Sequence, residues 1–192
     1  MKKKYEYVAG IDYSLTSPAI CIAEIINSCV VFEKCKFYYL KQNKSQGSFD
    51  NIFAHEYPEY TDDIERFTKL ADWTIECIRW FDNRASHVYL EDYAFAATGR
   101  VFNIGENTGI LKQHLRSNGF RYTTIPPTVI KKEATGKGNA NKELMYEAFV
   151  DELLTPTDLK ERLTPKATKI KNPVSDLVDA YFIAKCGAEG LL

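Results

Sequence analysis

Apolar and polar residues alternate with two different periods along the chain. Near the N-terminus, three short apolar runs separated by a few polar residues predict three consecutive strands in an antiparallel meander. Farther along, apolar residues recur every three to four positions, as in helices with one buried face. Two further strand-like runs lie between these helical segments. The predicted strands are Tyr5–Ile11, Ala19–Ile26, Val30–Leu40, His87–Glu91 and Arg121–Ile125.

The helical segments alternate with the later strands and then follow them. They are expected at Asp63–Asn83, Val101–Asn118, Thr128–Ala134, Lys142–Leu154 and Asn172–Lys185. In the last helix we expect Asn172 to be the cap, Pro173 the first helical residue and Gly187 the closing residue. The order β-β-β-α-β-α-β-α-α-α predicts an α/β fold, in which a five-stranded mixed sheet is flanked by helices.

Three connecting segments are expected to be irregular. The polar segment Lys41–Asp62 is predicted to be a long loop, and such loops are uncommon in compact domains unless they are functional or mobile. Tyr93–Arg100 is predicted to be a short loop, and the basic segment Leu159–Lys171 is predicted to be irregular.

Composition limits the class of protein. A chain of 192 residues with 45% apolar and 27% charged residues is expected to form one domain, residues 1–192. It has no apolar run of about 18 residues, so we expect no membrane span. The five cysteines are odd in number and lack Cys-x-x-Cys spacing, which argues against a disulfide framework or a zinc site. This indicates a reducing compartment: the cytoplasm of a bacterial cell, or of the host cell if the protein is viral.

Two acids, Asp176 and Asp179, lie three positions apart in the last predicted helix and therefore share one face. Their neighbours are nearly all apolar, and a helix that is apolar on most sides is normally buried. Buried carboxylates repel each other and are costly to desolvate unless something positive lies between them. A divalent cation such as Mg²⁺, which prefers oxygen ligands, would supply that charge. The alternative is an exposed first turn, where acids favour the helix N-terminus.

Two further acids, Asp12 and Glu91, lie at the ends of apolar strands. Asp12 is either a turn residue or a ligand. If the first and fourth strands are neighbours and the last helix crosses them, the four carboxylates converge. Such a pocket can hold two divalent ions about 4 Å apart, an arrangement that serves in-line displacement at phosphodiesters. The sequence therefore predicts a metal site of Asp12, Glu91, Asp176 and Asp179, with Mg²⁺ or Mn²⁺ as cofactor.

Positive charges gather in two segments, although the net charge of the chain is only −1. Four lysines surround a glycine-containing loop, and five more cations lie between residues 160 and 171. Clustered cations beside a carboxylate pocket suit a polyanion whose backbone is cleaved, whereas solvated basic loops are the alternative. The lysines around the glycine loop are Lys131, Lys132, Lys137 and Lys142.

With these residues in place, the chain resembles the RuvC family of Holliday junction resolvases, which have the ribonuclease H-like fold. The resemblance covers nearly the whole chain and is carried by four motifs in sequence order. They are Gly10-Ile11-Asp12-Tyr13-Ser14, Leu90-Glu91-Asp92-Tyr93-Ala94-Phe95, Gly136-Lys137-Gly138-Asn139-Ala140-Asn141-Lys142 and Ser175-Asp176-Leu177-Val178-Asp179-Ala180. In that family the corresponding acids form the active site, which implies catalytic and metal-binding roles for the same four acids here.

The resemblance also implies roles for basic and aromatic residues. Lys142 closes the glycine loop, and Lys131 lies five residues before its first glycine, as lysines of the family do. Either lysine could stabilise transition-state charge or an attacking water. One extra residue after the fourth-strand Glu makes Phe95 the expected junction-facing residue and Tyr93 the alternative; both could instead belong to the core. DNA binding is therefore expected at Phe95, Tyr93, Lys131, Lys132, Lys137 and Lys142.

The resulting expectation is a crossover junction endodeoxyribonuclease of DNA recombination and repair. The resemblance implies a homodimer that binds a four-way junction and uses two metal ions per site. Gly105 and Gly109 indicate close approach to the helix Val101–Asn118 by another backbone, either of a partner subunit or of the sheet. The alternatives are a nuclease for forks or flaps, a sugar-kinase or chaperone-type ATPase, and a non-catalytic junction-binding protein. An ATPase of that type needs two domains, and this chain is about half long enough.

Overall fold

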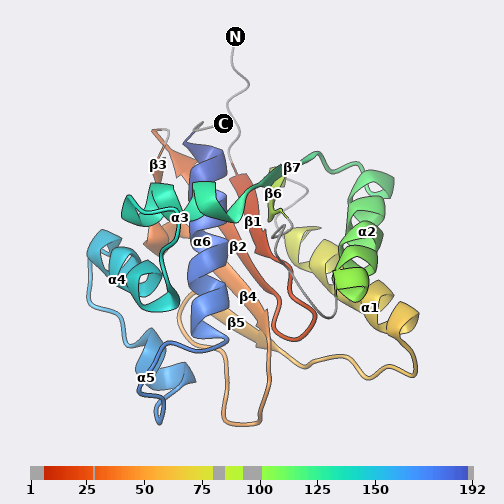
Figure 1. Ribbon diagram of the computed structural model, residues 1–192, viewed down its shortest axis with the longest axis horizontal. Coiled ribbons are helices and arrows are strands. Elements are labelled where there is room, and N and C mark those ends of the chain that lie inside the picture. The colour runs from red at the N-terminus through yellow and green to blue at the C-terminus, as the bar shows by residue number, and fades with distance from the viewer. Residues whose placement is uncertain (1–6, 28, 80–84, 93–100, 190–192) are drawn as a thin grey trace.

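The computed structural model describes residues 7–27, 29–79, 85–92 and 101–189 and shows a mixed sheet with helices on both faces (Figure 1). The strand order is β5-β4-β2-β1-β6-β7, and the short β3 pairs with β2 outside this path. β1 is antiparallel to β2 and parallel to β6, so the first and fourth predicted strands are neighbours. The strands are β1 Tyr7–Asp12, β2 Ala19–Ile26, β3 Cys29–Val30, β4 Lys36–Leu40, β5 Ile52–His55, β6 Ala85–Glu91 and β7 Tyr122–Ile125.

In the residues that the structure describes, six α-helices cover the sheet. α1 and α2 pack on one face, and α6 lies on the other with α3, α4 and α5 around it (Figure 1). None of the helices in the described part of the chain is both long enough and apolar enough to cross a membrane. The helices are α1 Asp63–Arg79, α2 Val101–Ser117, α3 Pro127–Thr135, α4 Lys142–Glu152, α5 Leu159–Leu163 and α6 Val174–Ala188.

The strands at the centre of the sheet alternate between two apolar layers, because successive side chains point to opposite faces. Ala9 and Ile11 of β1 join the layer under α1 and α2, whereas Val8 joins the layer under α6. Gly10 also faces α6, and a Cβ on it would lie 2.2 Å from Ala184 N. The glycine therefore lets the backbone of α6 rest directly on β1.

Most of α6 is buried, which explains why its sequence is apolar on nearly every side. It lies against the sheet and is covered by α4, whose Glu152 accepts hydrogen bonds from Tyr181 Oη (2.9 Å) and Lys185 Nζ (2.5 Å). A Cβ on Gly187 would lie 2.2 Å from Tyr89 Cδ2, so this glycine serves close packing on β6. The expectation that Gly187 closes the helix is wrong, because α6 continues to Ala188.

Three other local predictions differ from the structure. The expected strand Val30–Leu40 is interrupted by the 3₁₀ turn η1 (Phe32–Lys34). The expected loop Lys41–Asp62 contains β5, which adds a parallel edge strand to β4. The basic segment Leu159–Lys171 contains α5, so it is not wholly irregular. The α/β class and mixed sheet are confirmed, with short strands in addition to the five expected.

Candidate active site

The sheet register brings Asp12 and Glu91 side by side. Ile11 of β1 pairs with Leu90 of β6, and both belong to the layer under α1 and α2. The next residue on each strand, Asp12 or Glu91, therefore points to the opposite face, where α6 lies. Adjacent strands are about 4.8 Å apart, so these two carboxylates emerge next to each other.

Asp176 and Asp179 come to the same place because α6 runs antiparallel to β1. Gly10 meets α6 at Ala180 and Ala184. Two residues along β1 span about 7 Å, which equals four to five residues of helix. Asp12 therefore faces the turn of α6 that precedes Ala180, and this turn carries Asp176 and Asp179. The side chain of Asp176 is buried (4% exposed), whereas the other three acids keep partly exposed surface.

Burial raises the pKa of all four carboxyls, and repulsion between neighbouring carboxylates raises it further for Asp12, Glu91 and Asp176. Burial, followed by repulsion from Asp176, Asp179 and Glu91, raises the pKa of Asp12 well above its usual range. Burial and then Asp179 raise the pKa of Glu91 to about 7. The pKa values of Asp176 and Asp179 rise to about 6, mainly through burial, while Lys142 lowers both. Strong perturbation by both burial and like charge is typical of functional sites.

Lys142, the first residue of α4, is held beside these acids by hydrogen bonds. Its Nζ donates to Asn172 Oδ1 (2.9 Å) and to Ser175 Oγ (3.0 Å). Ser175 Oγ lies 2.9 Å from Asn172 Oδ1 and 3.2 Å from Asp176 Oδ1, and its single proton can be donated to only one of them at a time. Asn172 therefore binds Lys142 instead of capping α6, and the prediction that it is the cap is wrong. The prediction that Pro173 is the first helical residue is wrong as well, because Pro173 occupies the cap position and α6 begins at Val174.

The other predicted basic and aromatic residues divide into three groups. Lys131 lies close enough to the site to lower the pKa of both Glu91 and Asp179. Lys132 and Lys137 are exposed around the glycine loop, in which Gly136 ends α3 with a φ of 75°. Tyr93 and Phe95 lie outside the described residues, so their predicted DNA contacts stay predictions.

Solved structures share this arrangement of strands and helices. RuvC of Thermus thermophilus matches with a TM-score of 0.58 and 18% identity over 95% of this chain and 93% of that chain. The chain has a RuvC-like fold. The yeast mitochondrial Holliday junction resolvase Ydc2 matches with a TM-score of 0.57 and 14% identity, over 96% of this chain and 78% of that one. The fowlpox virus resolvase, solved with substrate Holliday junction DNA, gives 0.55 and 14%, over 97% and 99%.

The RuvC-like fold is recognisable from structure where sequence comparison finds nothing. No family model matches the chain, and no curated protein matches its sequence. The structural likeness confirms the resemblance expected from the four motifs, at the level of the fold.

The donor set fits hard divalent cations. All four acids offer oxygen ligands, and Asp176 Oδ2 is buried without a hydrogen-bond partner among the described residues. Ser17 lowers the pKa of Asp176, although its Oγ forms no hydrogen bond of good geometry with any described residue. Within the described ranges, no three His, Cys, Asp or Glu side chains gather closely enough to enclose one ion. Mg²⁺ commonly uses only one or two protein carboxylates and completes its shell with water and substrate, so pairs of acids suffice.

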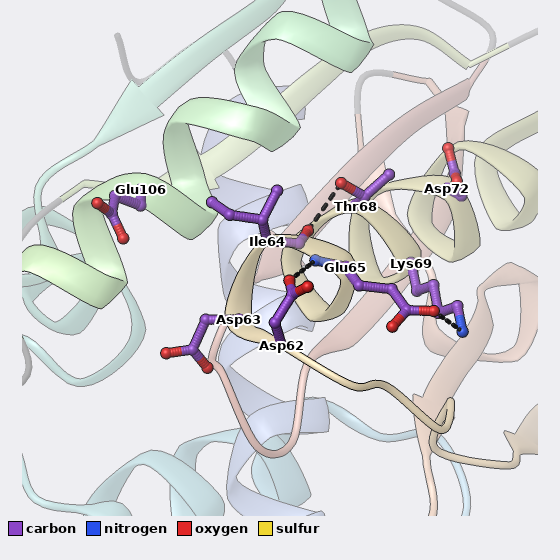
Figure 2. Close-up of a pocket in the computed structure, with 8 residues that line it drawn as sticks. All are labelled: Asp62, Asp63, Ile64, Glu65, Thr68, Lys69, Asp72 and Glu106. Carbon is purple, nitrogen blue, oxygen red and sulfur yellow. Dashed lines mark hydrogen bonds and ion pairs between the residues drawn. The ribbon is translucent and has the colours of Figure 1, made fainter.

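A second group of acids lies on the opposite face of the sheet, and its side chains differ from the four acids under α6 in exposure and in arrangement. Asp62, Asp63 and Asp72 of the α1 region and Glu106 of α2 are exposed around a shallow hollow (Figure 2). Figure 2 shows their side chains spread across the surface instead of converging. Asp62 Oδ1 accepts a hydrogen bond from Glu65 N (2.8 Å) and so caps α1.

Two site residues, Ser175 and Asn172, have contacts that the sequence analysis did not anticipate. Ser175 directly precedes Asp176, and Asn172 lies three residues before Ser175. This closeness to an acid of a buried helix is the sequence feature that could have indicated a role for them in the site. Their contact with Lys142 joins residues 30 and more positions apart, which sequence spacing does not reveal.

Proposed function

We propose that this protein is a metal-dependent, structure-specific DNA endonuclease that cleaves four-way junctions. The observation that carries the proposal is the convergence of Asp12, Glu91, Asp176 and Asp179, from two strands and one helix, with raised pKa values on a RuvC-like fold. The solved neighbours that share the fold are Holliday junction resolvases.

The four acids would hold two Mg²⁺ or Mn²⁺ ions. When bound, such ions activate a water molecule and stabilise the leaving oxygen of a phosphodiester. Lys142, fixed by Asn172 and Ser175, presents a positive charge to the acids and to the phosphate beside them. Lys131 approaches the same centre from α3, on the side of Glu91. The two lysines would offset charge that develops on the phosphate during cleavage.

The proposed homodimer uses α2. Phe102 of this helix is 85% exposed, and a Cβ on Gly105 or Gly109 would meet nothing in the described chain within 4 Å. The glycines therefore do not serve contact with the sheet, and that alternative is wrong. A second subunit packing across the glycine face would cover Phe102 and place two sites on one junction.

The proposal is tested by incubating the protein with labelled four-way junction, replication fork, flap and linear duplex in Mg²⁺ and in Mn²⁺. We expect cleavage of the junction in preference to linear duplex, and loss of cleavage in Asp12→Asn. Preference for fork or flap would favour the related nuclease activity instead. Cleavage that survives in Asp12→Asn, or tight junction binding without cleavage in either metal, would overturn the assignment.

A further inference from the structure

The hollow beside the four carboxylates continues away from them as a groove. Its first part is lined by Glu91 and Asp179 together with Lys142 and Lys171. Its second part is lined by Gln42, Lys142 and Lys171, among others. Its third part lies between the segments 42–46 and 163–172 and again includes Gln42 and Lys171. Because Lys171 lines all three parts, they form one continuous surface leading out of the site.

The far wall of this groove is the segment between β4 and β5, and it is held in a defined shape. The buried Gln46 accepts a hydrogen bond from Gln42 N at its Oε1 (2.8 Å). Tyr39 Oη donates to Gly47 O (3.2 Å). The guanidinium of Arg162 in α5 lies over the ring of Phe49, 4.8 Å from its centre, which joins this wall to the opposite one. Both walls lie toward the N-terminal end of α6 (Figure 1).

The groove is positively charged beyond the carboxylates. Lys166 and Lys171 line its outer parts, and none of the described residues that line those parts is acidic. No acid of the described chain forms an ion pair with either lysine. Gln42, Asn43 and Ser45 add polar side chains to the same wall. Lysines separated by neutral polar groups suit the evenly spaced charges of a phosphodiester backbone.

We propose that this groove binds the backbone of the DNA strand that leads away from the cleaved phosphate, with the segment 42–47 as its outer wall. The inference rests on the proposed function and gives a role to part of the long segment that was expected to be a loop between Lys41 and Asp62. Lys171 connects the groove to the site, and Lys166 binds a phosphate farther along the strand. The groove therefore contributes affinity and register, whereas the carboxylates contribute the chemistry.

The test is the salt dependence of junction binding by the double variant Lys166→Gln/Lys171→Gln. Binding of a fluorescent four-way junction is measured by anisotropy in Ca²⁺, between about 50 and about 200 mM salt. Each lost phosphate contact lowers the slope of log K against log salt by about 0.9, so we expect a decrease of about 2 per bound subunit. The affinity should fall by about tenfold or more at about 0.1 M salt.

The matched control is Lys34→Gln. Lys34 is exposed at the end of η1, near the pairing of β3 with Ile26, and this is the end of β2 opposite to the one beside Asp12. A second probe is a junction with uncharged methylphosphonates in the first few linkages beyond the cut. The wild type should bind this modified junction more weakly than the unmodified one, whereas the double variant should bind both junctions with the same affinity.

The possible outcomes separate the two proposals. If the wild type cleaves junctions and the double variant has the same salt slope as Lys34→Gln, the groove assignment is wrong and the nuclease assignment stands. If the wild type binds DNA but cleaves none, the nuclease assignment fails and the slope still tests the groove. If the wild type binds no DNA, both are wrong.

Discussion

Two groups of acids lie on opposite faces of the same sheet, and they differ in their surroundings. Asp12, Glu91, Asp176 and Asp179 converge beneath α6, where burial raises the pKa of each carboxyl. The acids at the start of α1 and on α2 are spread over an exposed surface (Figure 2). There the pKa of Glu65 is lowered to about 2, by hydrogen bonds first to Lys69 and then to Thr61.

The comparison shows why the number of acids does not identify a site. The α1 group satisfies its own charges through a helix cap, an ion pair and water, so it has no need of a cation. The group under α6 has one buried oxygen without a partner and repulsion that the nearby lysines reduce only in part. Unrelieved charge in a buried place is the physical difference on which we propose a functional role for the group under α6 and helix stabilisation for the α1 group.

The largest expected difference is in cleavage. Asp176→Asn should reduce single-turnover cleavage of a four-way junction by at least about a thousandfold, because it removes a ligand charge from the proposed metal site. Asp63→Asn, the matched change in the exposed group, should stay within about twofold of the wild type. Thermal unfolding of both variants checks that each is folded. Retention of a tenth of the activity by Asp176→Asn would contradict the comparison.

Removal of the lysine charge should have the next largest effect. We expect Lys142→Gln to slow cleavage by about a hundredfold at saturating DNA, because charge on the phosphate is then offset less well. Lys69→Gln, which removes the lysine beside Glu65, should leave the rate unchanged. Ser175→Ala should act in the same direction as Lys142→Gln but more weakly, since Ser175 only positions the lysine, and Ser175→Thr should restore the rate. An equal loss in Ser175→Thr would mean that packing, not the hydroxyl, matters there.

The two groups should also respond to pH with opposite signs. The pKa of Asp176 is higher in the folded protein than in the unfolded chain, so its contribution to stability is full below about pH 4 and is lost as pH rises through about 6. In EDTA, Asp176→Asn should therefore gain stability relative to the wild type by on the order of 2 kcal/mol between about pH 4 and pH 8.

Glu65 has the opposite shift, so its contribution is present above about pH 4 and is lost as pH falls through about 2. Glu65→Gln should accordingly lose stability at neutral pH and converge with the wild type in acid. Urea unfolding across the pH range measures both differences. A relative stability of Asp176→Asn that does not change with pH would argue against buried repulsion.

The smallest expected effect is stabilisation by metal. Mg²⁺ at ten times its dissociation constant should stabilise the wild type by about 1.4 kcal/mol, because it binds only the folded site. Asp63→Asn should keep this stabilisation, and Asp179→Asn should lose most of it. Thermal unfolding with and without MgCl₂ measures the shift. A wild-type protein that Mg²⁺ and Mn²⁺ both fail to stabilise would contradict a metal site under α6.

The elements that carry the acids could be predicted from sequence because local pattern and tertiary role agree there. Ala19–Ile26 was predicted at its observed bounds, and the apolar surroundings of Asp176 and Asp179 indicated a buried helix. The predicted convergence of the four carboxylates required the first and fourth strands to be neighbours. The structure meets this condition, because β1 pairs with β6 and aligns Asp12 with Glu91.

Elements that depend on distant contacts could not be read in the same way. β5 has four residues and exists because β4 offers it a parallel edge, and α5 has five residues packed through Leu159 and Leu163. Neither is long enough to show a period. Asn172 was mistaken for a cap because nothing local reveals that Lys142, 30 residues earlier, competes for its side chain.

The contact of Gly10 with α6 has a consequence for redesign. The gap between Asp12 and the acids of α6 is set by main-chain atoms in van der Waals contact, with no intervening side chain to trim or enlarge. An alanine at residue 10 would place its methyl group 2.2 Å from Ala184 N, so α6 would have to move off β1 and carry Asp176 and Asp179 away from Asp12.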